Sequence, residues 1–202
     1  LEDVQHLHRD ESGHLLPEEV AAVEMLNILR PIVAVSLFIE FAAAALVEHP
    51  RWRRAFSAGE EDDLEPFVQE VRRHYPFFPA VPGRVRESFD WRGHRFGTGD
   101  WVILDLYGTC HDPRLWEDPG AFRPERFRGW SWQERPHTLI AQGAGRHEEG
   151  HRCPGEWSTV ELLKQSVRLL STGDLRAPAQ DLSIPLDRFP TGPRSGVVLE
   201  RA

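Results

Sequence analysis

An arginine followed by a proline lies inside a long apolar segment, where an arginine could bind an anion. Between Met25 and Val47 the only charged residues are Arg30 and Glu40. A guanidinium group matches a carboxylate in a bidentate geometry, and a buried charge without a partner is strongly destabilising. Arg30 is therefore expected to be buried and paired. Its partner is either the carboxylate of a bound amphiphile or a distant Asp or Glu of the same chain.

The segment that carries Arg30 has the pattern of one long helix. Pro17 followed by two glutamates is typical of a helix start, and a helix from Pro17 to Glu48 would be about 48 Å long. Its longest uncharged stretches are shorter than the ~20 residues that a membrane span requires, so we predict no span. Pro31 has no N–H group and predicts a kink, which would shape a pocket beside Arg30.

One stripe of this helix could accommodate an amphiphile. At helical spacing the stripe combines the guanidinium with small and apolar side chains, namely Asn27, Arg30, Ala34, Phe38 and Phe41. Such a surface suits a ligand with an acidic head and a long apolar tail.

A single cysteine in a glycine-containing loop is the second candidate for chemistry. Cys153 lies in the sequence QGAGRHEEGHRCPGE, shortly before a predicted amphipathic helix at Glu156–Leu170. Gly143 permits a tight backbone, and His151 adds positive charge. The N-terminus of a helix stabilises a thiolate, so Cys153 is a candidate metal ligand. Together with Arg30, a lone thiolate indicates a haem iron beside a carboxylate-binding arginine.

Two other interpretations of this cysteine remain open. A zinc site formed by His147, His151 and Cys153 would lack a fourth protein ligand nearby and the usual paired spacing. A structural thiol without chemistry is the simpler alternative. The second cysteine, Cys110, is expected to be an inert buried thiol.

Composition limits the class of protein. The 202 residues carry a net charge of −8, and the isoelectric point near 5.7 argues against nucleic acid as a partner. Two cysteines form no disulfide framework and no secretory signal is visible, so we expect a cytoplasmic protein. The chain starts without Met, at what resembles the tail of a helix. We therefore expect residues 1–202 to be the C-terminal half of a single larger domain.

Three motifs in order resemble the C-terminal half of a cytochrome P450. Glu70-Val71-Arg72-Arg73 resembles the E-x-x-R motif, and Phe122–Phe127, FRPERF, resembles the segment whose arginine joins that pair. Cys153 follows at the place of the proximal haem ligand. The resemblance implies a mainly α fold with small β-sheets. It also implies a structural charge triad of Glu70, Arg73 and Arg126.

The same resemblance implies a cofactor and its contacts. Haem b would take the Cys153 thiolate as its axial ligand. The haem would also contact Gln142, Gly143 and His151.

Departures from the general pattern point to one branch of the family. Gln142 stands where the cysteine loop usually has Phe, residues 146–150 lengthen that loop, and Arg30-Pro31 replaces the usual acid–alcohol pair. These features resemble the bacterial fatty-acid peroxygenases, as do Asp105–Thr109 and His111–Pro113.

This branch implies hydroxylation of long-chain fatty acids at the α or β carbon with hydrogen peroxide, or their decarboxylation, without a redox partner. Arg30 would hold the substrate carboxylate as general acid–base, and Pro31 would shape the pocket. The alternatives are a reductase-dependent monooxygenase and a non-catalytic haem-binding remnant.

Alternation and turn residues predict the remaining elements. Phe89–Phe96 and Trp101–Leu106 alternate around glycine-containing turns, which indicates a small β-sheet. Leu182–Leu186 and Val197–Glu200 are predicted to form a hairpin near the C-terminus.

Overall fold

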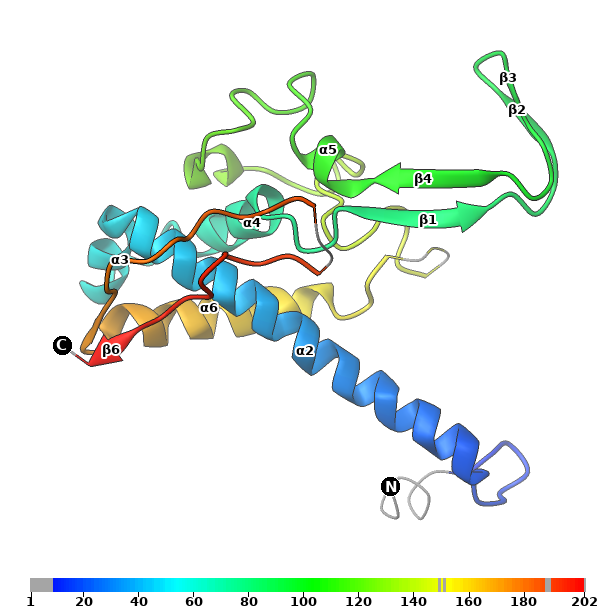
Figure 1. Cartoon of the computed structure of the whole chain (residues 1–202), viewed down its shortest axis with the longest axis horizontal. Coiled ribbons are helices and arrows are strands. Elements are labelled where there is room, and N and C mark those ends of the chain that lie inside the picture. Colours follow the sequence, from blue (N-terminus) through cyan, green and yellow to red (C-terminus); the bar gives the residue numbers. More distant parts are fainter. Residues whose placement is uncertain (1–8, 149, 151, 188–189, 202) are drawn as a thin grey trace. The chain divides into compact units, whose positions relative to one another are not determined.

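The computed structural model of the chain describes residues 9–148, 150, 152–187 and 190–201. Its contacts divide into two compact units, residues 1–37 and residues 38–202. Helix α2, Glu18–Glu48, contributes its first part to unit 1 and its second part to unit 2 (Figure 1).

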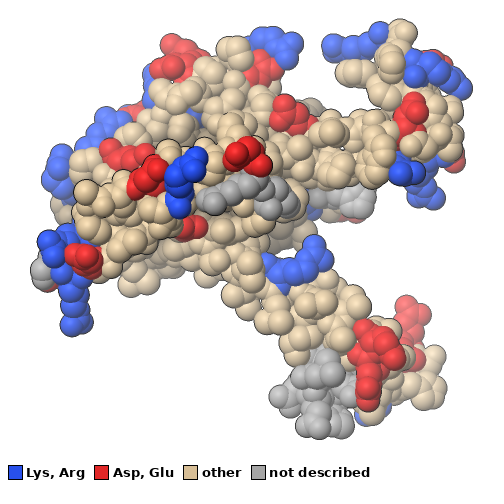
Figure 2. Space-filling view, viewed as in Figure 1, with Lys and Arg blue, Asp and Glu red and all other residues tan. Residues whose placement is uncertain are grey.

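Unit 1 consists of a short turn followed by the first part of α2. The turn is closed by a bridge between Arg9 and Leu15. The helix begins as predicted, since the amide of Ala21 donates to the carbonyl of Pro17 at 2.9 Å, and it continues through Pro31 without a break. Figure 2 shows this part as mostly uncharged, with the acidic side chains gathered near its start.

The length and apolar composition of α2 meet the requirements of a membrane span. The short uncharged stretches on which the sequence argument relied therefore do not exclude one. Core helices of water-soluble proteins meet the same requirements, so composition alone does not decide between the two.

Unit 2 has its main core between four helices. The second part of α2 packs with α3 (Pro50–Ser57), α4 (Leu64–His74) and α6 (Glu156–Thr172). Small side chains at 42–45 of α2 are buried, which lets the neighbouring elements approach closely. The amphipathic prediction for α6 is confirmed for Val160, Leu163 and Val167. The amphipathic pattern also predicts Trp157 on this face, but Trp157 is exposed and stacks on His147 with ring centroids 4.1 Å apart.

Two antiparallel strand pairs form the predicted β region. Strand β1, Ala80–Arg84, pairs with β4, Trp101–Asp105, and β2, Phe89–Trp91, pairs with β3, His94–Phe96. The hairpin turn places Arg92 and Gly93 at φ 48° and 79°, as a two-residue turn of type I′ requires. The hairpin extends beyond the β1–β4 pair (Figure 1). The sequence pattern missed β1 because Pro and Gly occupy its centre.

A second core packs around the segment that follows β4. It contains side chains of α5, Leu106–Cys110, and of the 3₁₀ helix η1, Pro124–Phe127. Asp105 caps α5 by accepting a hydrogen bond from the Gly108 amide at 2.7 Å. A Cβ at Gly108 would lie 2.0 Å from that carboxylate, so this tight cap requires glycine.

The C-terminal hairpin was predicted at the wrong residues. The paired strands are β5, Leu175–Arg176, and β6, Glu200–Arg201. The first predicted segment makes an isolated backbone contact outside the second one instead, in which the amide of Arg194 donates to the carbonyl of Ser183 at 2.9 Å. Pro185 and Pro193 lack N–H donors, so each removes a hydrogen bond that a ladder at these positions would need.

Candidate functional site

Arg30 lies on α2 in unit 1, and its side chain is exposed. The expectation that Arg30 is buried is therefore wrong for this chain. Within the described residues no carboxylate forms an ion pair with it. The apolar side chains around it are also exposed, including Leu26 (55%), Ile32 (64%) and Val33 (62%). The first part of α2 thus presents an open apolar surface with one cation, and Pro31 lies on the same exposed stretch.

Glu70 and Arg73 form a buried bidentate ion pair on α4. Arg73 donates from Nε to Glu70 Oε2 at 2.7 Å and from Nη2 to Oε1 at 2.8 Å, and both residues are 0% exposed. The spacing of three places both side chains on one face of the helix. Arg126 of η1 completes the group, with its Nε 3.3 Å from Glu70 Oε2. That contact is an ion pair without a well-directed hydrogen bond, because the same Nε has no hydrogen-bond partner.

This triad ties the segment 110–126 to α4. Arg73 Nη1 donates to the carbonyls of Cys110 and Pro119 at 2.8 and 2.9 Å. Arg126 Nη1 donates to the carbonyl of Glu117 at 2.6 Å. Glu70 Oε1, which accepts from Arg73, also accepts a hydrogen bond from the backbone amide of Arg123 at 2.7 Å. The buried charges are therefore paired and hydrogen-bonded, as burial demands.

The cysteine loop runs from Gln142 to the start of α6. Gly143 has φ 102°, a conformation that favours glycine. The amide of Cys153 donates to the carbonyl of Gln142 at 2.9 Å, which closes the base of the loop. Cys153 is partly exposed and unpaired, whereas Cys110 is buried. Burial raises the pKa of the Cys110 thiol to about 11, as expected for an inert thiol. His151 lies outside the described residues.

A second buried cluster, which the sequence pattern did not indicate, joins α4 to this loop. Its centre is Glu156, the first residue of α6, whose carboxylate pairs with Arg72 and Arg152. Arg72 occupies a variable position of the E-x-x-R motif, to which the motif assigns no role. Glu156 is a glutamate in the first turn of a helix, which is a common position for this residue. Their separation by 84 positions left no local signal. The apolar residues near Arg72 in the sequence could have indicated its burial, since Phe67, Val68 and Val71 are themselves buried.

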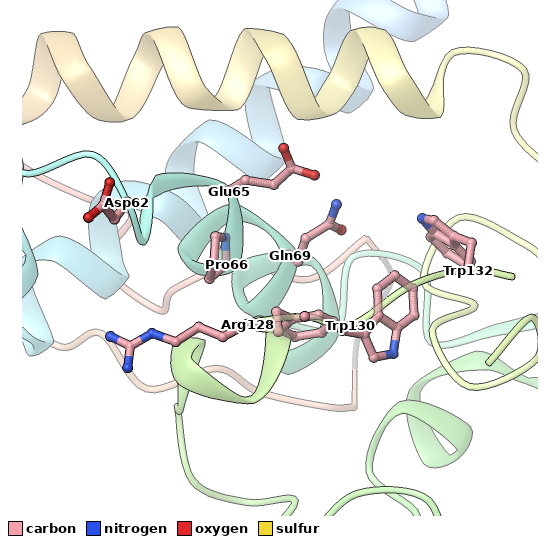
Figure 3. Close-up of a pocket in the computed structure, with 9 residues that line it drawn as sticks. Asp62, Glu65, Pro66, Gln69, Arg128, Trp130 and Trp132 are labelled. Atoms are coloured by element: carbon pink, nitrogen blue, oxygen red, sulfur yellow. The ribbon is translucent and has the colours of Figure 1, made fainter. Parts of the chain in front are cut away.

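A surface pocket of about 390 Å³ lies on the outer side of this cluster. Figure 3 shows Pro66 and Gln69 of α4 next to the segment that carries Arg128, Trp130 and Trp132, whereas the Glu65 carboxylate points away from that segment. Gln69 accepts a hydrogen bond from Arg72, and Trp132 stacks on the guanidinium of Arg152 at 3.7 Å. The pocket walls therefore screen the two buried arginines from solvent.

The residues around Cys153 fit a haem-thiolate ligand. A haem iron takes a single thiolate from the protein on its proximal side, since the macrocycle supplies its equatorial ligands. Cys153 supplies one accessible sulfur just before α6. Gly155 lies next to that sulfur, since a Cβ built there would be in van der Waals contact with Sγ at 3.8 Å. Within the described ranges, no three His, Cys, Asp or Glu side chains converge to bind a metal by themselves.

Comparison with known proteins gives the class. The family model for Cytochrome P450 matches residues 64–159, which hold the triad and the cysteine loop. Cytochrome P450 monooxygenase ple5B of Rhodocybe pseudopiperita is 34% identical over 65% of this chain and 28% of that protein. Rhazimal synthase of Alstonia scholaris is 27% identical over 68% of this chain and 31% of that protein. These matches assign the region that holds the triad and the cysteine loop to the cytochrome P450 family.

Solved structures narrow this class to one branch. A variant of Cytochrome P450SP alpha matches with a TM-score of 0.85 and 47% identity over 98% of this chain and 48% of that chain. Cytochrome P450EX alpha with myristic acid matches at 0.81 with 45% identity, over 98% of this chain and 48% of that one. A variant of cytochrome P450 OleT with arachidonic acid matches at 0.83 with 36% identity, covering 96% of this chain and 46% of that one.

The resemblance to the fatty-acid peroxygenase branch is thereby confirmed, as are the P450 fold and its mainly α class with small sheets. The chain spans about half the length of these solved structures and a smaller share of the curated relatives.

Proposed function

We propose that the protein containing this chain hydroxylates long-chain fatty acids at the α or β carbon with hydrogen peroxide, with decarboxylation as an alternative outcome. The observation that carries the proposal is Arg30-Pro31 on α2, in a chain that is 45% identical to a P450 holding myristic acid. An arginine on an apolar helix surface suits a ligand that is acidic at one end and apolar along its length.

In this proposal the cysteine loop holds the cofactor. The Cys153 thiolate would bind the iron of haem b, and Gln142, Gly143 and His151 would contact the haem. When bound, a thiolate-ligated haem supplies cleavage of the peroxide O–O bond. The Glu70–Arg73–Arg126 triad has a structural role and fixes the segment 110–126 against α4.

Arg30 binds the fatty-acid carboxylate and thereby provides the missing acid–base group. Cleavage of hydrogen peroxide requires a proton to move from one oxygen to the other. The bound carboxylate accepts that proton and returns it to the oxygen that leaves as water. One oxygen atom of the peroxide enters the substrate C–H bond, so the products are a hydroxy acid and water. No reductase is needed, because the peroxide is the two-electron oxidant.

The same contact determines which carbon reacts. A carboxylate held by Arg30 restricts the reacting position to the carbons next to it, since positioning accelerates only the group within reach. Pro31 shapes the helix surface at this point and takes no part in proton transfer.

Arg30→Leu tests the role of the carboxylate contact. We expect kcat/KM with a long-chain fatty acid and peroxide to fall by roughly 100-fold or more, because general acid–base catalysis contributes about that much. Arg54→Leu on α3, also exposed, is the matched control and should retain activity.

The matching substrate control is the fatty alcohol of the same chain length, which lacks the carboxylate and should not react even with the unmodified protein. Turnover of the alcohol at the rate of the acid would contradict the proposal.

A reductase-dependent monooxygenase is the second candidate, because a curated relative at 34% identity is described as a monooxygenase. It predicts activity only with an electron-transfer partner. The non-catalytic remnant has no observation in its favour.

We further propose that residues 1–202 form the C-terminal half of one P450 domain. The exposed apolar side chains of α2, such as Ile32 and Val33, and those of β4, such as Trp101 and Ile103, would then be covered by the other half, since exposed apolar surface of this extent favours burial. A cytoplasmic location and the absence of a nucleic-acid partner stay predictions.

A further inference from the structure

The carboxylate of Glu156 is shared by three basic side chains from two parts of unit 2. Arg72 reaches it from α4. Arg152 donates from Nε to its Oε2 at 2.7 Å, and His147 Nε2 lies 3.2 Å from the same oxygen. Arg152 and His147 belong to the cysteine loop, one on each side of residues 148–151. One carboxylate therefore joins α4 to both arms of the loop.

This cluster is enclosed and well satisfied. The side chains of Arg72, Glu156 and Arg152 are 0%, 5% and 7% exposed. Burial acts to raise the pKa of the Glu156 carboxyl, but Arg72 and Arg152 outweigh it and hold that pKa below its usual range. Arg72 Nε also donates to Gln142 Oε1 at 2.8 Å. Paired buried charges of this kind fix a geometry, because removing one partner leaves the others uncompensated.

The cluster acts at both ends of the loop that carries Cys153. The side chain of Gln142 accepts a hydrogen bond from Arg72. The backbone carbonyl of Gln142 accepts a hydrogen bond from the Cys153 amide at 2.9 Å. Its side-chain amide also donates to Thr159 of α6 at 3.3 Å. Arg152 is the residue directly before Cys153. Gln142 and Arg152, the two residues that adjoin Cys153 in the loop, are therefore both held by the Arg72–Glu156 pair.

We propose that Arg72 and Glu156 are positioning residues that hold the cysteine loop in place for its metal, separately from the Glu70–Arg73–Arg126 triad. The two clusters connect α4 to different parts of unit 2. Arg73 ties the helix to the segment 110–126, whereas Arg72 ties it to the loop and to α6. The inference rests on the proposed role of Cys153 as the haem ligand.

The test compares Glu156→Gln with Glu161→Gln. Both lie on α6, but Glu161 is 63% exposed and pairs with Lys164 at the surface. Each holoprotein is reduced and treated with carbon monoxide, and the absorption band of the thiolate-ligated complex is compared with that of the thiol-ligated complex. We expect Glu156→Gln to convert to the thiol-ligated form while Glu161→Gln keeps the thiolate band. Equal thiolate bands in the two variants would overturn the proposal.

Hydrogen exchange of the haem-free proteins gives a second readout that does not depend on the cofactor. In Glu156→Gln the peptide containing Cys153 should exchange roughly tenfold faster or more, since a buried charge has lost its partner. The peptide containing Glu70 and Arg73 should be unchanged. Loop exchange equal to that of Glu161→Gln would contradict the inference.

Two further comparisons keep the outcomes distinct. If Glu156→Gln does not fold, Arg152→Gln decides, because it keeps the Arg72–Glu156 pair and removes the contact of Glu156 with the residue directly before Cys153, together with the stacking of Arg152 on Trp132. Retention of the thiolate band and of loop protection in Arg152→Gln would then overturn the proposal. A wild-type holoprotein without any thiolate band would contradict the haem assignment instead, and loop exchange in the haem-free variants would still decide the positioning role.

Discussion

Burial determines what each charged residue of the E-x-x-R segment contributes. Glu70 is fully buried and accepts hydrogen bonds from Arg73 and from the amide of Arg123. Glu61, a few residues earlier, pairs with Arg168 at the surface. The sequence alone does not distinguish these two glutamates, since one lies in the amphipathic helix α4 and the other shortly before it. Their energetic roles differ because a desolvated charge depends on its partner, whereas a solvated one does not.

Replacing Glu70 should therefore destabilise the protein strongly. We expect Glu70→Gln to lower the free energy of unfolding by about 3–5 kcal/mol, because Arg73 would be left buried without its counter-charge. Urea denaturation measures this directly. Glu61→Gln is the control and should leave the denaturation midpoint unchanged. Equal midpoints for the two variants would refute the structural role of the triad.

The two cysteines should differ in reactivity. Cys153 is partly exposed, whereas Cys110 is 2% exposed and its burial raises the pKa of its thiol to about 11. Because the thiolate is the reactive form, iodoacetamide should modify Cys153 in the haem-free protein and leave Cys110 intact. Peptide mass spectrometry reports both sites. Preferential labelling of Cys110 would show that the loop does not present its sulfur as described.

At the scale of elements, helices with a clear apolar period were predictable and strands with breakers were not. The pattern of α6 predicted its start and the buried residues Val160, Leu163 and Val167, since burial along a helix repeats at 3.6 residues. It was wrong for Trp157, which is exposed. Strand β1 was missed because Pro82 and Gly83 disfavour strands in isolation, and pairing with β4 overrides that preference. The C-terminal pairing was misplaced for a related reason, since β5 and β6 contain only two residues each.

Neighbouring leucines on α6 test its orientation. Leu163 is 0% exposed and belongs to the main core, whereas Leu162 is 50% exposed. We expect Leu163→Ala to lower the free energy of unfolding by about 2–5 kcal/mol, because it leaves a cavity. Leu162→Ala should change it by less than about 0.5 kcal/mol. A reversed order in chemical denaturation would mean that α6 presents its other face to the core.

At the scale of the whole molecule, the stability of the protein should depend on pH through buried groups. Burial, reinforced by Arg73, lowers the pKa of His74 to about 3. The unfolded chain binds that proton near its ordinary pKa of roughly 6.5, so acid favours the unfolded state. The pKa of the Glu156 carboxyl is also lowered in the folded protein, so its contribution to stability is likewise lost as the pH falls. The free energy of unfolding should therefore fall as the pH drops from about 6.5 toward about 3.

A variant assigns this dependence to one residue. His74→Gln removes the titrating ring, and its free energy of unfolding should change less between pH 6.5 and 5 than that of the unmodified protein. Denaturation curves at several pH values give the comparison. An unchanged slope would show that His74 is not the group responsible.

The sequence predicted the family, the triad and the cysteine loop because each has a local pattern. It could not predict the environment of Arg30, because exposure depends on which surfaces cover α2. It also missed the pairing of Arg72 with Glu156, which joins residues far apart in the chain. An ion pair between distant charged residues produces no periodic pattern in the sequence, so it can be recognised only from the three-dimensional arrangement of the helices.

The most direct test of the central claim is to supply the holoprotein that carries this chain with hydrogen peroxide and a long-chain fatty acid, without any reductase. We expect hydroxy acids at the α or β carbon, or a terminal alkene, detected by mass spectrometry. Product that forms only when an electron-transfer system replaces the peroxide would contradict the account and assign the protein to the reductase-dependent monooxygenases.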